Sequence, residues 1–129
     1  MKVNPLELSL QLHTFFLNHL EDFTPKPGDK MTIKSDGTKV GPRDELLHQL
    51  LSEFAMNLFP LPIVSEEREC TWPTPYDDFW LIDPFDGSNN HDMGLPLIGS
   101  MVTLIQARQP VMSAIFIPFE EKTGKNGFY

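Results

Sequence analysis

The sequence has one cysteine, few basic residues and no long apolar run, and each shortage excludes a class of protein. Cys70 is the single cysteine among 129 residues, so neither an intrachain disulfide framework nor a cysteine-based zinc site is available. Ten Lys and Arg residues stand against 18 Asp and Glu residues, giving a net charge of −8. Because binding to the phosphate backbone needs clustered cations, this balance argues against duplex nucleic acid as the main partner.

The apolar residues are too scattered for a membrane protein. No apolar stretch approaches the roughly 20 residues that cross a bilayer. Glu7, Gln11 and His13 interrupt the N-terminal segment, so it lacks the charged-then-apolar pattern of a signal peptide. We therefore expect a cytoplasmic protein with no membrane partner. The 10 Phe and 2 Trp can supply a dense core, and the length suits a single domain over residues 1–129.

Apolar spacing predicts helices first and strands afterwards. Residues 4–21 place Leu6 and later apolar side chains at helical spacing, with Asn4 as the cap. Residues 43–59 repeat leucines at spacings of three and four and stop before Pro60. Short apolar runs predict strands at 31–33, 61–64, 79–82, 98–105 and 111–117.

Turn residues in the second half predict hairpins. We expect Gln109 and Pro110 to turn between the last two strands, which then pair antiparallel. Residues 123–127 have turn chemistry, and Phe128 and Tyr129 resemble the opening of a returning strand. Two helices followed by a run of strands predict an α+β fold or a layered α/β/α form.

Carboxylates follow two of the predicted strands. Glu66 and Glu67 come after one strand, and Asp83 and Asp86 come after another. The two aspartates can converge if the chain bends sharply at the proline between them, a bend that Gly87 permits. Carboxylates gathered in this way suit Mg²⁺ or Mn²⁺. The alternative is that the aspartates only form turns and that the glutamate pair is solvated.

Three segments of the sequence resemble motifs of one family, in the order in which the family has them. Residues 80–91, WLIDPFDGSNNH, resemble the signature of the inositol monophosphatase superfamily, W-x-x-D-P-x-D-G-T-x-N-F. Residues 63–67, IVSEE, resemble its preceding acidic strand end, and residues 34–44, KSDGTKVGPRD, are similar to a K-x-D-x-S-P-V-T-x-A-D segment of its nucleotide-bisphosphatase branch. The superfamily includes inositol monophosphatases, fructose-1,6-bisphosphatases and 3′(2′),5′-bisphosphate nucleotidases. They are metal-dependent, and lithium inhibits many of them.

The resemblance implies a set of metal ligands. Glu66, Asp83 and the backbone carbonyl of Phe85 would hold a first Mg²⁺ ion, with Mn²⁺ as a substitute. Asp83 would bridge to a second ion that Asp86 also binds. Glu67 would assist through a water molecule, as in some branches of the family.

The resemblance also implies roles in binding and catalysis. Asp44 would reach a weaker third ion, and Asp36 would help to activate water. The hydroxyl of Ser88 would position the attacking water, in place of the family's threonine. The N–H groups of Gly87 and Ser88 would face the substrate phosphate at the start of a helix.

The sequence also departs from the family patterns. Residues 38–41, Thr-Lys-Val-Gly, lack one hydroxyl and the proline of the family's S-P-V-T, and Arg43 replaces an alanine beside Asp44. His91 replaces the usual aromatic residue. The family's later W-D-x-A-A-G segment, which supplies another metal-binding aspartate, does not occur in these 129 residues. We therefore expect the N-terminal half of the sugar-phosphatase-like fold, with weakened binding of the second ion.

The combined expectation is a lithium-sensitive Mg²⁺-dependent phosphatase. It would hydrolyse a small phosphate ester, an inositol phosphate or a nucleotide 3′,5′-bisphosphate, by means of metal-activated water. The alternative is an inactive fragment that keeps metal and anion binding, or one half of a split enzyme that needs a homodimer or a complementing C-terminal chain. His13 and His48 fall on predicted helices without metal-ligand spacing and are expected to be solvated or half-buried.

Overall fold

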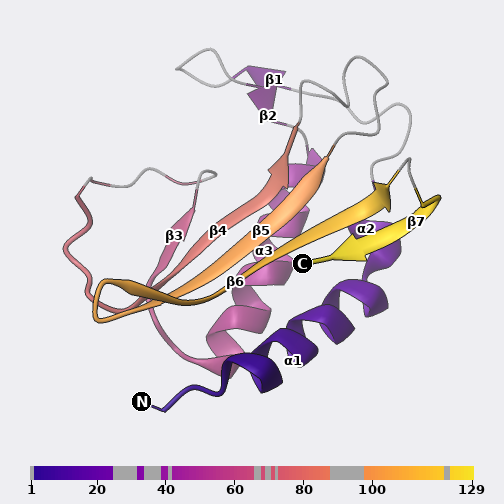
Figure 1. Cartoon of the computed structure of the whole chain (residues 1–129). Helices are drawn as coiled ribbons and strands as arrows, with labels where there is room; N and C mark the ends of the chain where they lie inside the picture. Colours follow the sequence, from indigo (N-terminus) through magenta and orange to yellow (C-terminus); the bar gives the residue numbers. More distant parts are fainter. Residues whose placement is uncertain are drawn as a thin grey trace.

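The computed structural model describes residues 2–24, 32–33, 39–40, 42–65, 68, 71, 73–87, 98–120 and 123–129. Among these residues, helices pack against one face of a mixed sheet (Figure 1). None of the described helices is both long and apolar enough to span a membrane. The architecture confirms the expected α+β class.

The helices precede most of the strands. They are α1 (Pro5–Asn18), α2 (Leu20–Phe23) and α3 (Pro42–Leu58). The main sheet has the order β3-β4-β5-β6-β7, in which β3 is parallel to β4 and the other pairs are antiparallel. Its strands are β3 (Ile63–Ser65), β4 (Phe79–Asp86), β5 (Gly99–Gln106), β6 (Gln109–Glu120) and β7 (Lys125–Phe128). A separate antiparallel pair is formed by β1 (Thr32–Ile33) and β2 (Lys39–Val40).

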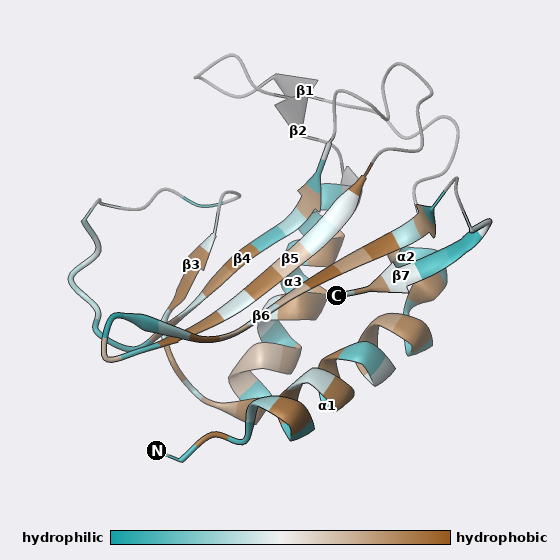
Figure 2. Ribbon diagram, in the orientation of Figure 1, coloured by the Kyte–Doolittle hydropathy of each residue, from teal (hydrophilic) through white to brown (hydrophobic). Residues whose placement is uncertain are grey.

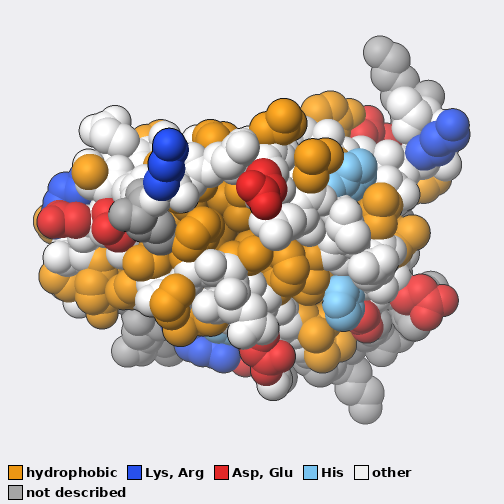
Figure 3. All heavy atoms as spheres, turned by 90° about the horizontal axis from the view of Figure 1, so that it is seen from below, with side chains coloured by type: hydrophobic (Ala, Val, Ile, Leu, Met, Phe, Trp, Pro, Cys, Tyr) orange, Lys and Arg blue, Asp and Glu red, His pale blue; other side chains and the backbone are white. Residues whose placement is uncertain are grey.

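Helix α1 begins at the expected cap and buries one of its faces. The side chain of Asn4 accepts hydrogen bonds from the backbone N–H groups of Leu6 and Glu7, at 3.1 and 3.2 Å. Leu8 and Leu12 are buried, whereas Leu6, which the sequence placed at helical spacing, is 69% exposed. At about 100° per residue, Leu6 falls on the side of the helix opposite the core. Figure 3 views the molecule from the helix side, where apolar side chains reach the surface.

The core lies between the helices and the sheet. The rings of Phe16 on α1 and Phe116 on β6 stack with their centroids 4.8 Å apart. Trp80 on β4 is fully buried, and its indole N–H donates a hydrogen bond of 3.0 Å to the carbonyl oxygen of Phe59. Figure 2 shows apolar residues repeated along β4, β5 and β6. These contacts fix the sheet against the helices and so fix the direction in which β4 ends.

The hairpin between β5 and β6 is confirmed, but its turn is not at Gln109 and Pro110. The turn residues are Ala107 and Arg108, with φ of 50° and 60°. A two-residue hairpin turn of this kind favours Asn or Gly because both central residues need a positive φ. The sequence carries neither residue there, and this absence hid the turn. Pro110 instead pairs with Ile105 at a register shift inside the ladder.

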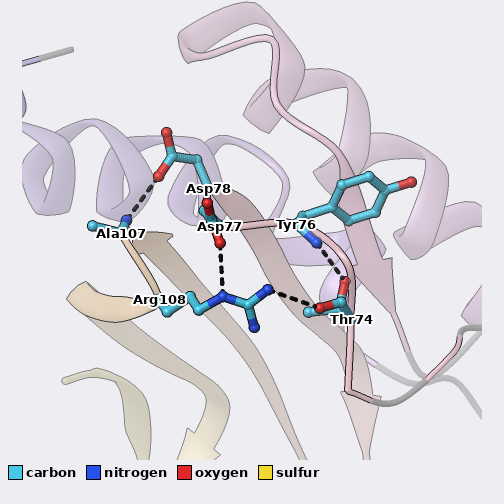
Figure 4. A network of polar contacts seen from close by, with 6 residues as sticks. All are labelled: Thr74, Tyr76, Asp77, Asp78, Ala107 and Arg108. Carbon is cyan, nitrogen blue, oxygen red and sulfur yellow. Dashed lines mark hydrogen bonds and ion pairs between the residues drawn. The ribbon is translucent and has the colours of Figure 1, made fainter.

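The segment before β4 holds this turn in place (Figure 4). The Asp78 carboxylate accepts the N–H of Ala107 at 2.7 Å, and the backbone carbonyl of Asp77 accepts the N–H of Arg108 at 2.9 Å. The Arg108 side chain donates to the Asp77 carboxylate at 2.7 Å and to the carbonyl of Thr74 at 3.4 Å. These contacts offset the cost of two non-glycine residues in the left-handed region.

We expect Ala107→Gly to stabilise the protein by about 0.5–1 kcal/mol. Glycine removes the steric cost of the positive φ and keeps the N–H that Asp78 accepts, although the unfolded chain gains some entropy. Urea unfolding measures the difference. Arg108→Gly is the matched control, since it also relieves the backbone but loses the Asp77 ion pair, and it should gain less. A destabilised Ala107→Gly variant would show that the turn carries no strain.

The last hairpin also forms, with its turn placed earlier than expected. Thr123 and Gly124 make the turn, with a φ of 68° at Gly124, and Asn126 and Gly127 already belong to β7. The backbone of Tyr129 continues the pairing, because its N–H and carbonyl both bond to Ile115, at 2.9 and 2.8 Å. The predicted returning strand is therefore confirmed.

Candidate metal and phosphate site

A β-bulge at the carboxyl end of β4 shapes the candidate site. Asp83 pairs with Met101 and Asp86 pairs with Gly99, so three steps along β4 match two along β5. In a regular strand, residues three apart point to opposite faces. The extra residue instead returns Asp86 to the face of Asp83, in line with Leu81, which is 36% exposed. The bulge thus places the half-buried Asp83 and the exposed Asp86 on the same side of the sheet, away from the helices.

The residues inside the bulge are held by the core. Pro84 is fully buried, and its carbonyl accepts a buried hydrogen bond of 2.7 Å from the hydroxyl of Ser100 on β5. Phe85 packs in the hydrophobic core. Gly87 follows with a φ of 95°, a conformation that other residues rarely adopt, and ends the strand. The bend expected around the proline is therefore a bulge followed by a glycine turn.

The neighbouring strand leads to the same edge of the sheet. Because β3 is parallel to β4 and Ser65 pairs with Ile82, β3 ends level with the residue before Asp83. Glu66 and Glu67 follow Ser65 directly in the sequence. The sequence-predicted site residues that lie outside the described part of the chain are Glu66, Glu67, Ser88 and Asp36.

Helix α3 brings a third described carboxylate to this region. Asp44 lies in the first turn of α3 and is 2% exposed. The helix packs along β4, and in Figure 1 its first turn lies near the end of the sheet where β4 finishes. Arg68, which follows β3, forms a two-pronged ion pair with Glu45, with both N–O distances at 3.2 Å. This pair ties the segment after β3 to the first turn of α3, although its exposed position limits its effect on stability.

His48 lies one turn further along α3 and is 7% exposed, so it is more deeply buried than the sequence suggested. Its Nε2 atom is buried without a hydrogen bond among the described residues. Burial lowers the pKa of His48, the positive charge of Arg68 lowers it further, and Glu45 partly opposes them. The sequence around His48 predicted neither its burial nor its lowered pKa. The charge of Arg68, which contributes to the shift, comes from a segment distant in the sequence.

The depressed pKa of His48 predicts a loss of stability in acid. Above the unfolded pKa of about 6.5, His48 is neutral in both states, so it adds no pH dependence. As the pH falls below that value, the unfolded chain takes up the proton first and unfolding becomes easier. We expect the free energy of unfolding to fall less between about pH 7.5 and pH 5 in His48→Gln than in the wild type. Gln49→Ala, on the same helix, should keep the wild-type profile, and equal slopes in all three proteins would contradict the assignment.

The donor chemistry of the site suits a hard cation. Asp83, Asp86 and Asp44 offer carboxylate oxygens, the ligands that Mg²⁺ prefers. Within the described ranges, no three His, Cys, Asp or Glu side chains form a cluster that could hold a metal ion. The described carboxylates therefore fit as part of a ligand set that further groups would have to complete.

Comparisons with known proteins agree with the motifs. No known family model matches the sequence. The chain is 31% identical over 109 residues to the 3′(2′),5′-bisphosphate nucleotidase CysQ of Haemophilus influenzae, covering 81% of this chain and 40% of that protein. Its fold is similar to that of the suhB protein of Bartonella henselae, with a TM-score of 0.71, 16% identity and coverage of 92% of this chain and 46% of that one. It is also similar to an IMPase/NADP phosphatase complexed with Mg²⁺ and phosphate, with a TM-score of 0.74, 18% identity and coverage of 98% and 51%.

The fold and the motifs are similar to those of the N-terminal portion of sugar-phosphatase-like proteins. The resemblance to the inositol monophosphatase superfamily, which includes the CysQ nucleotidases, is confirmed over this portion. The relatives of this class are phosphatases. The chain spans about 40% of the length of the curated relative and about half of the solved chains.

Proposed function

We propose that this chain carries the metal- and phosphate-binding part of a Mg²⁺-dependent phosphomonoesterase. The observation that carries the proposal is the bulge that turns Asp83 and Asp86 to one side at the end of β4. One solved neighbour is an IMPase/NADP phosphatase complexed with Mg²⁺ and phosphate, which supports the choice of cation and anion. When bound, Mg²⁺ would supply a Lewis acid that stabilises phosphoryl charge and lowers the pKa of a bound water.

Several residues of this chain would bind the metal ions. Asp83 would contact both of the principal ions, with Asp86 on one side, and with Glu66 and the carbonyl of Phe85 on the other. The bulge orients the two aspartates before any ligand arrives, so any cost of bringing like charges together falls on folding and not on metal binding. Glu67 would act through water.

The substrate side of the site would be formed by backbone donors. Gly87, whose positive φ lets the chain turn sharply after β4, would present its N–H with that of Ser88 to the substrate phosphate. Ser88 would position the attacking water, and Asp36 would help to activate it. Asp44 would serve a weaker third ion. A small phosphate ester is the proposed substrate, with a nucleotide 3′,5′-bisphosphate favoured by the CysQ relative over an inositol phosphate.

Phosphate release tests the proposal directly. The chain is incubated with adenosine 3′,5′-bisphosphate, an inositol monophosphate and fructose 1,6-bisphosphate, with MgCl₂ or with EDTA. We expect release only with Mg²⁺, and lithium should lower it. Release that is equal in EDTA would refute the metal mechanism. A cytoplasmic location and a single domain over residues 1–129 belong to the same proposal.

A second function, binding without turnover, is favoured by the small part of its relatives' length that the chain covers. Because the chain spans only about 40% of the curated relative, it would keep part of the ligand set and depend on a complementing chain or a homodimer for activity. Mg²⁺ with phosphate would then raise the unfolding temperature through binding to the native state alone, with no phosphate released. Measuring both quantities on one preparation separates the two functions.

A further inference from the structure

Helix α1 carries a row of exposed leucines on the side away from the core. Leu6, Leu10 and Leu17 are 69%, 58% and 44% exposed. His13 is half-buried on the same side of the helix, and its ring stacks on that of Phe128 with the centroids 4.5 Å apart. At about 100° per residue, these four positions of α1 fall within about 60° of one another around the helix axis. We call Leu6, Leu10, His13 and Leu17 the α1 stripe.

The α1 stripe is unusually apolar for the outer side of a surface helix. Such a side normally carries charged and polar residues, but Glu7 is the single charged side chain of α1. Leu8 and Leu12 fill the core on the inner side, so α1 is apolar on two sides. A helix of this kind is typical of one that packs on both sides. Since α1 contains neither Lys nor Arg and the chain carries a net charge of −8, an anionic membrane surface is a poor partner.

The spacing of the α1 stripe indicates which partner fits it. The steps from Leu6 to Leu10, His13 and Leu17 are four, three and four residues, which is the alternation of a coiled-coil seam. These steps read the same in both directions along the helix. A two-fold axis through the middle of the stripe therefore brings the stripe onto itself, and such self-complementarity is what a symmetric interface between identical chains requires.

We propose that the α1 stripe docks the α1 stripe of a second copy of this chain, with the two helices antiparallel. In this pairing, Leu6 of one copy lies level with Leu17 of the other, and Leu10 lies level with His13. All three exposed leucines of each copy are then covered by the opposite helix. The histidine is the one polar member of the seam, and a polar residue at a seam position fixes the register at some cost in stability.

The charges of the chain permit this pairing. Glu7 lies beside the stripe, and in the antiparallel arrangement it faces Thr14 of the second copy. The Glu7 residues of the two copies lie about 13 Å apart along the helix axes, so their repulsion is weak in salt. Asp83 and Asp86 lie on the opposite side of the sheet from the helices, so the pairing leaves the candidate site of each copy uncovered. The inference therefore does not depend on the proposed function.

Sedimentation of the 129-residue chain over a range of concentrations tests the pairing. We expect a dimer whose share rises with concentration, because a small interface gives a weak complex. The double variant Leu10→Ser with Leu17→Ser should weaken dimerisation about tenfold or more. The matched control, Ile115→Ser with Phe119→Ser, changes comparably exposed residues of β6, 41% and 43%, and should leave dimerisation unchanged. His13→Leu should strengthen dimerisation about threefold or more, because it makes the seam wholly apolar.

Cross-linking tests the antiparallel direction. The background is Cys70→Ser, so that each chain carries one engineered cysteine. A mixture of Leu6→Cys and Leu17→Cys chains, treated with a short bis-maleimide, should give a cross-linked dimer. Either variant alone should not, because the two copies of residue 6, and likewise those of residue 17, lie about 16 Å apart along the axes.

Several results would overturn the proposal. They are a chain that stays monomeric at every concentration, a dimer that the β6 control weakens as much as the α1 double variant does, and efficient cross-linking of Leu6→Cys with itself. A His13→Leu chain that dimerises less than the wild type would also contradict the central position of His13 in the seam.

Discussion

Asp83→Asn is expected to lower Mg²⁺-dependent phosphate release at least about a hundredfold. Asp83 is the carboxylate that the proposed mechanism uses for both principal ions, and the bulge aims it at the same side as Asp86. An amide keeps the shape of the side chain but removes the charge that holds a hard cation. The measurement is the initial rate of phosphate release by the chain.

The same substitution should act differently on stability. Carboxylates placed to bind a cation are not placed to stabilise the fold, so without a cation Asp83→Asn is expected to leave the unfolding temperature unchanged or to raise it slightly. With Mg²⁺, the wild type should gain stability and the variant should not. Glu21→Gln, an exposed carboxylate on α2, is the matched control and should behave as the wild type in both assays. Undiminished phosphate release by Asp83→Asn would refute the proposed site.

Trp80→Ala is expected to produce the largest loss of stability, about 3–5 kcal/mol. Trp80 is fully buried near the start of β4, and its indole N–H satisfies the carbonyl oxygen of Phe59 after α3. Removal of the ring leaves a cavity and an unpaired carbonyl together. Since small domains unfold at a cost of about 5–15 kcal/mol, the variant is expected to lose a large share of its stability and to unfold at a clearly lower urea concentration.

Two further variants separate the causes of that loss. Trp80→Phe keeps much of the ring volume and loses the hydrogen bond, and it should cost about 1–3 kcal/mol. Leu81→Ala changes the next residue, which faces away from the core and is 36% exposed, and it should cost less than about 1 kcal/mol. Urea unfolding followed by circular dichroism gives all three values. A Trp80→Ala variant as stable as Leu81→Ala would contradict the packing described for β4.

The elements with strong local signals were predictable from the sequence. The cap at Asn4 and the leucine repeat before Pro60 correspond to α1 and α3, within one or two residues at most ends. The turns were less predictable. Ala107 and Arg108 carry no turn signal, because the contacts that hold their backbone come from Asp77 and Asp78, about 30 residues away in the chain.

The candidate site was also only partly predictable from the sequence. The acidic residues around Pro84 could be found in the sequence, since the spacing of the motif is local. The side of the sheet to which they point could not, because residues three apart in a strand diverge unless a bulge intervenes. That bulge depends on pairing with β5 and on the hydroxyl of Ser100, both distant in sequence. The lowered pKa of His48 could not be predicted for the same reason: part of the shift comes from Arg68, which lies outside the helix.

The amino-acid sequence by itself determined the class of fold, the order of helices and strands, and which carboxylates carry the proposed chemistry. These properties follow from local periodicity and from contiguous motifs, which need no knowledge of distant contacts. Tertiary structure alone decided that Asp83 and Asp86 share a face, that Met101 and Ile115 continue this face across the sheet, and that the described helices pack against the other face. The physical reason is that strand pairing joins residues far apart in the chain, and register across a sheet is set by the whole core and not by any one segment.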